Sequence, residues 1–172
     1  IGLGEDGLWT ALLQDAGAGP EPIERSSELL VSHDLVGVER ILRESDELDE
    51  EAIGQASRLI QLRGGTEVLE QARGLGGAGF AEVLDRLTAN FEAISSRSLG
   101  REVLLDLGML RDIGYYSGST IEVYDDAVGD VIGGGGRYDD LMNRFGLDLP
   151  AAGFTLYIER IHKAQLERGR DV

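Results

Sequence analysis

The hydrophobic pattern of this chain changes its period near Gly100, and that change limits the possible folds more than any other feature. From residue 34 to residue 99, apolar residues recur at helical spacing, which is typical of amphipathic helices. After Gly100, short apolar or alternating runs separated by turn residues are typical of strands. Helices followed by strands predict an α+β fold built on an antiparallel sheet with flanking helices.

The first part of the chain predicts a series of helices. We expect a short helix ending near Gly17, then a connection over residues 18–27 because of Pro20 and Pro22. Further helices are expected from Asp34, from about Asp49 to Leu62, from Thr66, and from Phe80 to Ser96. The glycine-rich stretch 74–79 is interpreted as a loop between helices, because it lacks the lysine and the preceding strand of a phosphate-binding loop.

The second part predicts strands at residues 103–107, 120–124, 131–132 and 152–159, followed by a terminal helix. Four consecutive glycines, Gly133–Gly136, stand between an apolar strand and a helix-like run over residues 138–145. Glycine adopts positive φ freely and places no side chain in the way of a ligand. The run therefore predicts a binding site or a tight turn.

The charge balance argues against nucleic-acid and membrane partners. The chain has 32 acidic and 16 basic residues, a formal net charge of -16, so its field repels polyanions and anionic membranes. No apolar run approaches the ~18 residues of a membrane span, and the first residues do not resemble a signal peptide. We therefore expect a cytoplasmic protein. The chain starts at Ile1 without Met, in what resembles the end of a strand, which is consistent with a fragment.

Metal and cofactor sites are not expected. The chain has no cysteine, and its two histidines, His33 and His162, are far apart in sequence. No nucleophile stands beside a base, and His162 is interpreted as a helix-surface residue.

The glycine run and the tyrosines near it are the candidate ligand site. Arg111, Tyr115, Tyr116, Arg137 and Tyr138 supply donors and flat aromatic faces, which suit a small zwitterion or carboxylate. Either Asp106 or Asp139 could hold an ammonium group.

Each of these residues also has a purely structural interpretation. Arg137 can pair with Asp139 or cap a helix, and Asp106 can form a turn. Tyr115 and Tyr116 can be one inward and one outward residue of a strand.

Several ordered motifs resemble the histidine signatures and third motif of the histidyl-tRNA synthetase family. They are RDIGYYSG at 111–118, GGRYDDL at 135–141, FG at 145–146, PAAGF at 150–154 and ER at 159–160. The resemblance implies a partial class II aminoacyl-tRNA synthetase-like core over residues 1–172. Within it, 34–99 would be a helical segment and 100–172 a sheet-forming segment, and the first two class II motifs have no counterpart.

Two kinds of protein share the core that these motifs resemble. One is the synthetase, and the other is the noncatalytic regulatory subunit of ATP phosphoribosyltransferase, which partners the catalytic subunit in the first step of histidine biosynthesis. This chain has Gly114 where synthetases have an aspartate, and Tyr157 where their third motif has a glycine. Tyr157 is expected to lie on the last strand and intrude where ATP would bind, although Arg160, at the position that meets ATP phosphates in the synthetase, is kept.

The resemblance favours the regulatory subunit, with a synthetase catalytic-core fragment as the alternative. Only twelve residues follow Arg160, so this chain does not contain the anticodon-binding domain of a synthetase, and the net charge opposes tRNA. The implied partners are the catalytic subunit and further copies in the full-length protein. The implied ligand is histidine, with allosteric feedback, and no catalytic residue is expected. The residues implied to bind histidine are Arg111, Tyr115, Tyr116, Gly135, Gly136, Arg137 and Tyr138, and Arg160 is a vestigial ATP-site position.

Overall fold

The computed structural model describes residues 1–110 and 116–169. The helices in this part are α1 (Gly7–Asp15), α2 (Pro20–Val31), α3 (Leu35–Glu44), α4 (Glu50–Leu59), α5 (Glu67–Ala72), α6 (Ala78–Ser95), α7 (Asp139–Asn143) and α8 (Ile158–Glu167). The strands are β1 (Gly2–Glu5), β2 (Arg63–Gly64), β3 (Leu104–Asp106), β4 (Ser119–Asp125), β5 (Asp130–Arg137) and β6 (Ala152–Leu156).

The strands form a six-stranded sheet in the order β2-β3-β1-β4-β5-β6. The predicted antiparallel sheet is confirmed for the pairs β2–β3, β1–β4, β4–β5 and β5–β6. It is wrong for β1 and β3, which run parallel. The 98 residues that separate these two strands in the sequence contain the helical segment, which provides the long crossover that a parallel pair needs.

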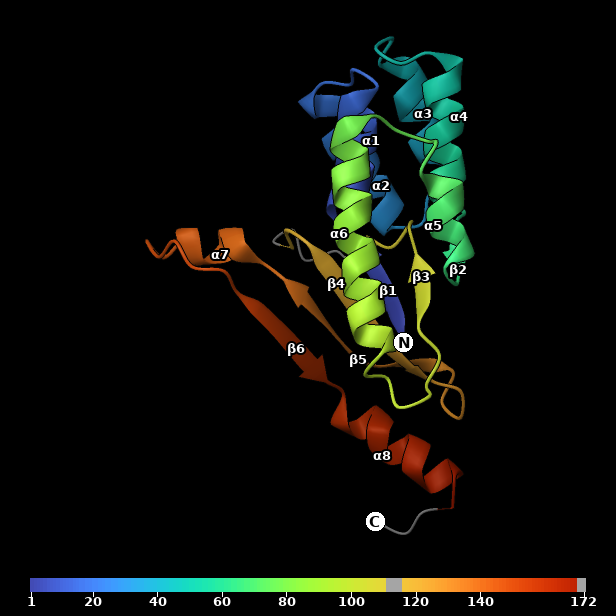
Figure 1. Cartoon of the computed structure of the whole chain (residues 1–172), viewed down its shortest axis with the longest axis vertical. Coiled ribbons are helices and arrows are strands. Elements are labelled where there is room, and N and C mark those ends of the chain that lie inside the picture. The colour runs from blue at the N-terminus through green and yellow to red at the C-terminus, as the bar shows by residue number, and fades with distance from the viewer. Residues whose placement is uncertain (111–115, 170–172) are drawn as a thin grey trace.

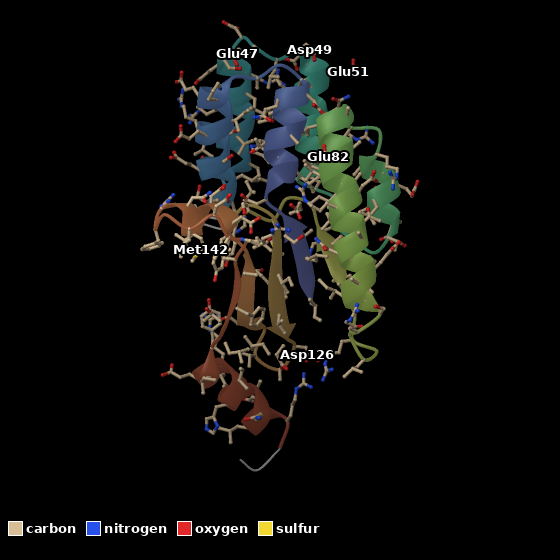
Figure 2. The ribbon with its side chains drawn as sticks, turned by 60° about the vertical axis from the view of Figure 1, so that its left-hand side comes forward. Glu47, Asp49, Glu51, Glu82, Asp126 and Met142 are labelled. Carbon is tan, nitrogen blue, oxygen red and sulfur yellow. The ribbon has the colours of Figure 1, made fainter. Side chains whose placement is uncertain are left out.

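Helix α6 covers one face of the sheet and joins it to the other helices (Figure 1). Its buried side chains Phe80, Leu84 and Leu87 belong to the same hydrophobic cluster as Leu3 of β1 and Leu105 of β3. Figure 1 shows α1 to α5 gathered toward one end of the sheet, while β6 and α8 extend away from them. In Figure 2 the labelled Glu47, Asp49 and Glu51 lie at the end of the helical layer remote from the strands. The expected helical and sheet-forming segments therefore share one core.

The connection expected over residues 18–27 is wrong, because α2 begins at Pro20. Gly19 precedes it in an extended conformation, and Pro20 and Pro22 occupy the first turn. The first N–H groups of a helix have no carbonyl partner within the helix, so proline loses nothing there. The prolines begin a helix instead of breaking one.

The tight turn that the sequence left open at Gly133–Gly136, as the alternative to a binding site, does not form, because these glycines lie inside β5 and none of them has a positive φ. They are needed for close approach by neighbouring groups. A Cβ at Gly133 would stand 2.9 Å from Cε1 of Phe154, and one at Gly136 would stand 2.7 Å from the ring of Tyr116. Both distances are shorter than van der Waals contact between carbon atoms.

The last predicted strand ends earlier than expected. β6 stops at Leu156, Tyr157 is the N-cap residue of α8, and residues 158 and 159 already belong to the helix. The short strand β2 was not predicted, because Gly64 reads as a helix stop. The terminal helix itself is confirmed, and His162 lies exposed on it as expected.

Candidate functional site

Cross-strand pairing places a row of small residues on one face of the sheet. Gly4 pairs with Thr120, Thr120 with Gly136, and Gly136 with Gly153. Directly opposite residues of neighbouring strands point to the same face, so this row forms a floor almost without side chains across β1, β4, β5 and β6. We call the side of the sheet that carries this row the glycine face.

Tyrosine rings stand directly on the glycine face. The ring of Tyr116 lies against Gly136, and the hydroxyl of Tyr138 lies so close to Gly153 that a Cβ there would collide with it. The two ring centroids are 6.3 Å apart and the ring planes are tilted by 51°. This distance and tilt are typical of an aromatic pair. Any side chain at Gly136 or Gly153 would displace these rings.

Carboxylates occupy the next row of the same face. Glu122 of β4 pairs with Gly2 on one side and with Gly134 on the other. The hydroxyl of Tyr124 donates a hydrogen bond to Oε2 of Glu122. Burial, together with this bond to a carboxylate, raises the pKa of Tyr124 to about 12. The phenol therefore stays protonated well above neutral pH and keeps its hydrogen bond to Glu122.

A second carboxylate, Asp106 of β3, completes the acidic side of the glycine face. Burial raises the pKa of Asp106 above its ordinary value. Arg63, whose Nε lies 3.7 Å from Oδ2, and the backbone N–H of Gly108 act in the opposite direction. With the two tyrosines, these carboxylates can bind and orient a small cationic or zwitterionic molecule.

The structure brings only some of the predicted site residues together. Tyr116, Gly136 and Tyr138 meet on the glycine face. Gly135 faces the opposite side, toward Phe154, and Arg137 lies on that side as well. The Nε–H of Arg137 donates to Oδ2 of Asp139 at 2.7 Å, which is the structural pairing that the sequence left open.

Two predicted site residues, Arg111 and Tyr115, lie outside the described residues. The neighbouring Gly114 does too, so the position where synthetases have an aspartate is also outside them.

Arg160 is held by intramolecular contacts at the start of α8. Its guanidinium donates to the carbonyl of Val131 at 2.6 Å and to Oδ1 of Asp130 at 3.1 Å. The same guanidinium lies 4.6 Å from the centroid of the Tyr157 ring, a cation–π contact. An incoming phosphate would have to compete with these partners.

Sequence reasoning missed the pair Glu122 and Tyr124 and the buried residue Glu5. The first pair could have been found, because alternation along β4 puts Thr120, Glu122 and Tyr124 on one face. Nothing in the sequence marks Glu5, whose side chain is fully buried.

Among the described residues, no cluster of three or more acidic or histidine side chains could hold a metal ion. In the same part of the chain, no helix is both long enough and apolar enough to span a membrane.

Solved structures share this architecture. An ATP phosphoribosyltransferase regulatory subunit/histidyl-tRNA synthetase from Bacillus halodurans is 28% identical with a TM-score of 0.85, and the match covers 95% of this chain and 43% of that one. A histidyl-tRNA synthetase from Nostoc is 19% identical with a TM-score of 0.71, covering 97% and 42%, which shows the fold alone. The expected class II synthetase-like fold is confirmed.

Relatives of known name are similar over almost the whole chain. The ATP phosphoribosyltransferase regulatory subunit of Desulforamulus reducens is 39% identical over 169 residues, 98% of this chain and 42% of that protein. The protein of the same name from Moorella thermoacetica is 38% identical over 168 residues, 97% and 43% of the two chains. This chain thus spans about two fifths of the length of these relatives.

The sequence also matches the family description "Histidyl-tRNA synthetase" over residues 1–161. Since this range is most of the 172 residues, the chain belongs to the histidyl-tRNA synthetase family.

Proposed function

We propose that the chain is part of a noncatalytic regulatory subunit of ATP phosphoribosyltransferase. It would act in the cytoplasm with the catalytic subunit in the first step of histidine biosynthesis, and in feedback control by histidine. One observation carries the proposal: the relatives named as regulatory subunits are 39% and 38% identical over nearly the whole chain. Solved chains named only as histidine–tRNA synthetases or ligases are 19% and 22% identical.

The proposed partner is the catalytic subunit of the transferase. The fold also matches a chain of the solved ATP phosphoribosyl transferase complex from Thermotoga maritima, with a TM-score of 0.58 and 20% identity. That likeness concerns the fold alone, so the partner rests on the named relatives. The net charge of -16 supports a protein partner over tRNA, because tRNA is a polyanion. We further propose that the full-length protein assembles with copies of itself.

The proposed ligand site is the glycine face with the tyrosines above it. Tyr116 and Tyr138 would contact an imidazole through ring faces and hydroxyl groups, and Glu122 would attract the ammonium group. Arg111 and Tyr115 remain proposed members that reach the ligand from outside the described residues. Gly136 would let the ring of Tyr116 lie against the sheet beside the ligand, while Gly135 and Arg137 would act from the opposite face by holding β5 in place.

The contacts of Arg160 support a noncatalytic role. Its guanidinium is already bonded to Asp130 and to the carbonyl of Val131, and stacked on Tyr157. The pair with Asp130 is exposed to solvent and is worth about 0–1 kcal/mol, so these contacts would oppose recruitment of Arg160 to a phosphate only modestly. In a noncatalytic subunit, histidine would act by binding one assembly state of the complex more tightly than another, and not by entering a chemical reaction.

A histidyl-tRNA synthetase catalytic-core fragment is the alternative function. It is favoured by the retained Arg160 and by the family match over residues 1–161. In either case we propose that residues 1–172 are one part of a class II core, with a helical segment over 34–99 and a sheet-forming segment over 100–172.

The test compares the two functions in the full-length protein. Wild type, Tyr116→Phe and Tyr138→Phe are mixed with the catalytic subunit, and transferase activity is measured against histidine concentration. Each variant loses one hydroxyl and keeps its ring. We expect each to weaken histidine inhibition by roughly tenfold, the value of one hydrogen bond, with activation of the catalytic subunit unchanged.

Tyr157→Phe is the matched control, because it also removes one hydroxyl but lies at the start of α8. The parallel assay is histidine-dependent exchange of pyrophosphate into ATP. Activation of the transferase without exchange would support the regulatory subunit. Exchange without transferase activation would establish the synthetase instead.

A further inference from the structure

A small polar cavity lies on the side of the sheet opposite the glycine face. Its volume is about 220 Å³, it is open to solvent on one side, and it is lined by α6, the end of β1, and residues at the adjoining ends of β4 and β5. The side chains that bear on its chemistry are Glu5, Arg86, Asn90, Ser119, Arg137 and Asp139. The cavity is smaller than the roughly 300–1,000 Å³ of drug-sized ligand pockets, so it suits a group of only a few atoms.

Glu5 is the first of two acidic residues that line the cavity, and both of its carboxylate oxygens accept hydrogen bonds. The side chain of Glu5 is 0% exposed. Its Oε1 accepts from Arg86 at 3.2 Å, and its Oε2 accepts from the hydroxyl of Ser119 at 2.5 Å. The Ser119 hydroxyl in turn accepts from Nδ2 of Asn90 at 2.7 Å. These bonds satisfy a charge that would otherwise be costly to bury.

Asp139 is the second acidic residue that lines the cavity, and both of its carboxylate oxygens also accept hydrogen bonds. Oδ2 of Asp139 accepts from Nε of Arg137 at 2.7 Å, and Oδ1 accepts from the backbone N–H of Ala151 at 3.1 Å. Both carboxylates around the cavity have thus committed both of their oxygens to partners within the chain.

The guanidinium groups of Arg86 and Arg137 have N–H donors beyond those in these bonds. A guanidinium carries five N–H groups in a planar fork. In the part of the chain that the structure describes, Arg86 donates one to Glu5 and Arg137 donates one to Asp139. Both guanidinium groups therefore keep donor capacity beyond these two bonds, and they come from separate elements, α6 and β5.

We propose that this cavity binds a small oxyanion, a phosphate or a carboxylate, between Arg86 and Arg137. Guanidinium forks match the geometry of both groups, and the carboxylate bonded to each guanidinium, Glu5 or Asp139, holds it in place. Binding should be weak, because the two arginines are neutralised by Glu5 and Asp139 and the whole chain carries a charge of -16. The proposal is independent of the ligand proposed for the glycine face, which is on the other side of the sheet.

The direct test is a titration of the full chain with inorganic phosphate at constant ionic strength, observed by NMR of the arginine Nε–H groups. Constant ionic strength is needed because added salt alone screens exposed ion pairs. We expect saturable shifts of the Arg86 and Arg137 resonances. A parallel titration with acetate distinguishes a carboxylate ligand from a phosphate ligand.

Two substitutions with opposite expected signs test the mechanism. Arg86→Gln removes one cation and should weaken binding at least about tenfold, the value of one charge-assisted hydrogen bond. Glu5→Gln keeps the size of the side chain but removes a competing negative charge, so it should strengthen binding several-fold. The second variant also guards against misfolding of the first, because it leaves no buried charge unpaired.

Arg73→Gln is the matched control. Arg73 is 47% exposed and paired with Asp85 at 3.0 Å, while Arg86 is 43% exposed and paired with Glu5 at 3.2 Å, but Arg73 does not line the cavity. Unchanged binding in Arg73→Gln, with opposite changes in the other two variants, would support the site. Shifts that fail to saturate with both anions, or equal affinity in wild type and Glu5→Gln, would overturn it.

Discussion

Replacing Gly136 with alanine should destabilise the protein, although the same change usually stabilises a chain at an unstrained position. A Cβ at Gly136 would stand 2.7 Å from Cδ1 and Cε1 of Tyr116 and 2.8 Å from the carbonyl oxygen of Ser119. The carbonyl belongs to β4, the neighbouring strand in the ladder, and cannot move without shifting that strand. The tyrosine ring would also have to move, which would disturb its packing with Tyr138, its aromatic neighbour at 6.3 Å.

The expected magnitude combines two opposing effects. Forcing a methyl group into packed surroundings costs about 1–3 kcal/mol. Alanine also restricts the unfolded chain, which returns about 0.4–1 kcal/mol. The net loss in the free energy of unfolding is about 1–2 kcal/mol, and at this chain length it should lower Tm by about 3–6 °C.

Gly54→Ala is the control for this substitution. Gly54 lies in α4, and a Cβ built there has no neighbouring heavy atom within 4 Å. Helix propensity alone should therefore raise the free energy of unfolding by about 0.5–1 kcal/mol. Urea unfolding monitored by circular dichroism measures both variants against wild type. If Gly136→Ala proved as stable as Gly54→Ala, the packing of Tyr116 on the floor of the glycine face would be wrong.

Three other substitutions test separate parts of the fold. Asp6→Asn should raise the free energy of unfolding by about 1–2 kcal/mol at pH 8 and change it little at pH 4, as urea titrations at both values would measure. The reason is that burial, and to a lesser extent the charge of Glu5, raises the pKa of Asp6 from 3.8 to about 6. The ionised carboxylate is therefore less favourable in the folded protein, and the contribution of Asp6 to the free energy of unfolding falls as pH rises through this window. Equal effects of the substitution at both pH values would contradict this prediction. Asp34→Ala removes the cap bond to the Gly37 N–H at 2.9 Å and should cost about 1 kcal/mol, seen as a lower urea midpoint. Leu84→Ala truncates a side chain that is 0% exposed and should lower the free energy of unfolding by about 2–5 kcal/mol. A loss below about 1 kcal/mol in calorimetry would place Leu84 outside the core.

The helices could be predicted wherever apolar spacing and a cap agree. The helices that begin after Asp34 and Asp49 could be predicted because each aspartate is followed by apolar residues at helical spacing. In the structure, each aspartate side chain accepts a hydrogen bond from the backbone N–H three residues later. α2 was missed because proline was interpreted only as a breaker. Its other role, at the first position of a helix, depends on the extended residue before it, which the sequence does not reveal.

Part of the candidate site could be predicted because the tyrosines and glycines stand in conspicuous motifs. The parallel pairing of β1 with β3 could not, because it depends on how the helical segment crosses the sheet. Glu5 was equally hidden, since its partners Arg86 and Ser119 are 81 and 114 residues away. Long-range pairs of this kind leave no local pattern.

The alternation of β5 explains why one continuous motif serves two faces of the sheet. Gly136 and the following Tyr138 contribute to the glycine face, whereas Gly135 and Arg137 belong to the side covered by α6. Successive residues of a strand cannot all touch one ligand, so the motif must divide its roles. Arg137 positions Asp139, whose Oδ1 accepts from the N–H of Ala151, and the N–H of Tyr138 donates to the Ala151 carbonyl at 2.8 Å. The motif thus attaches the beginning of β6 on one face while it presents an aromatic ring on the other.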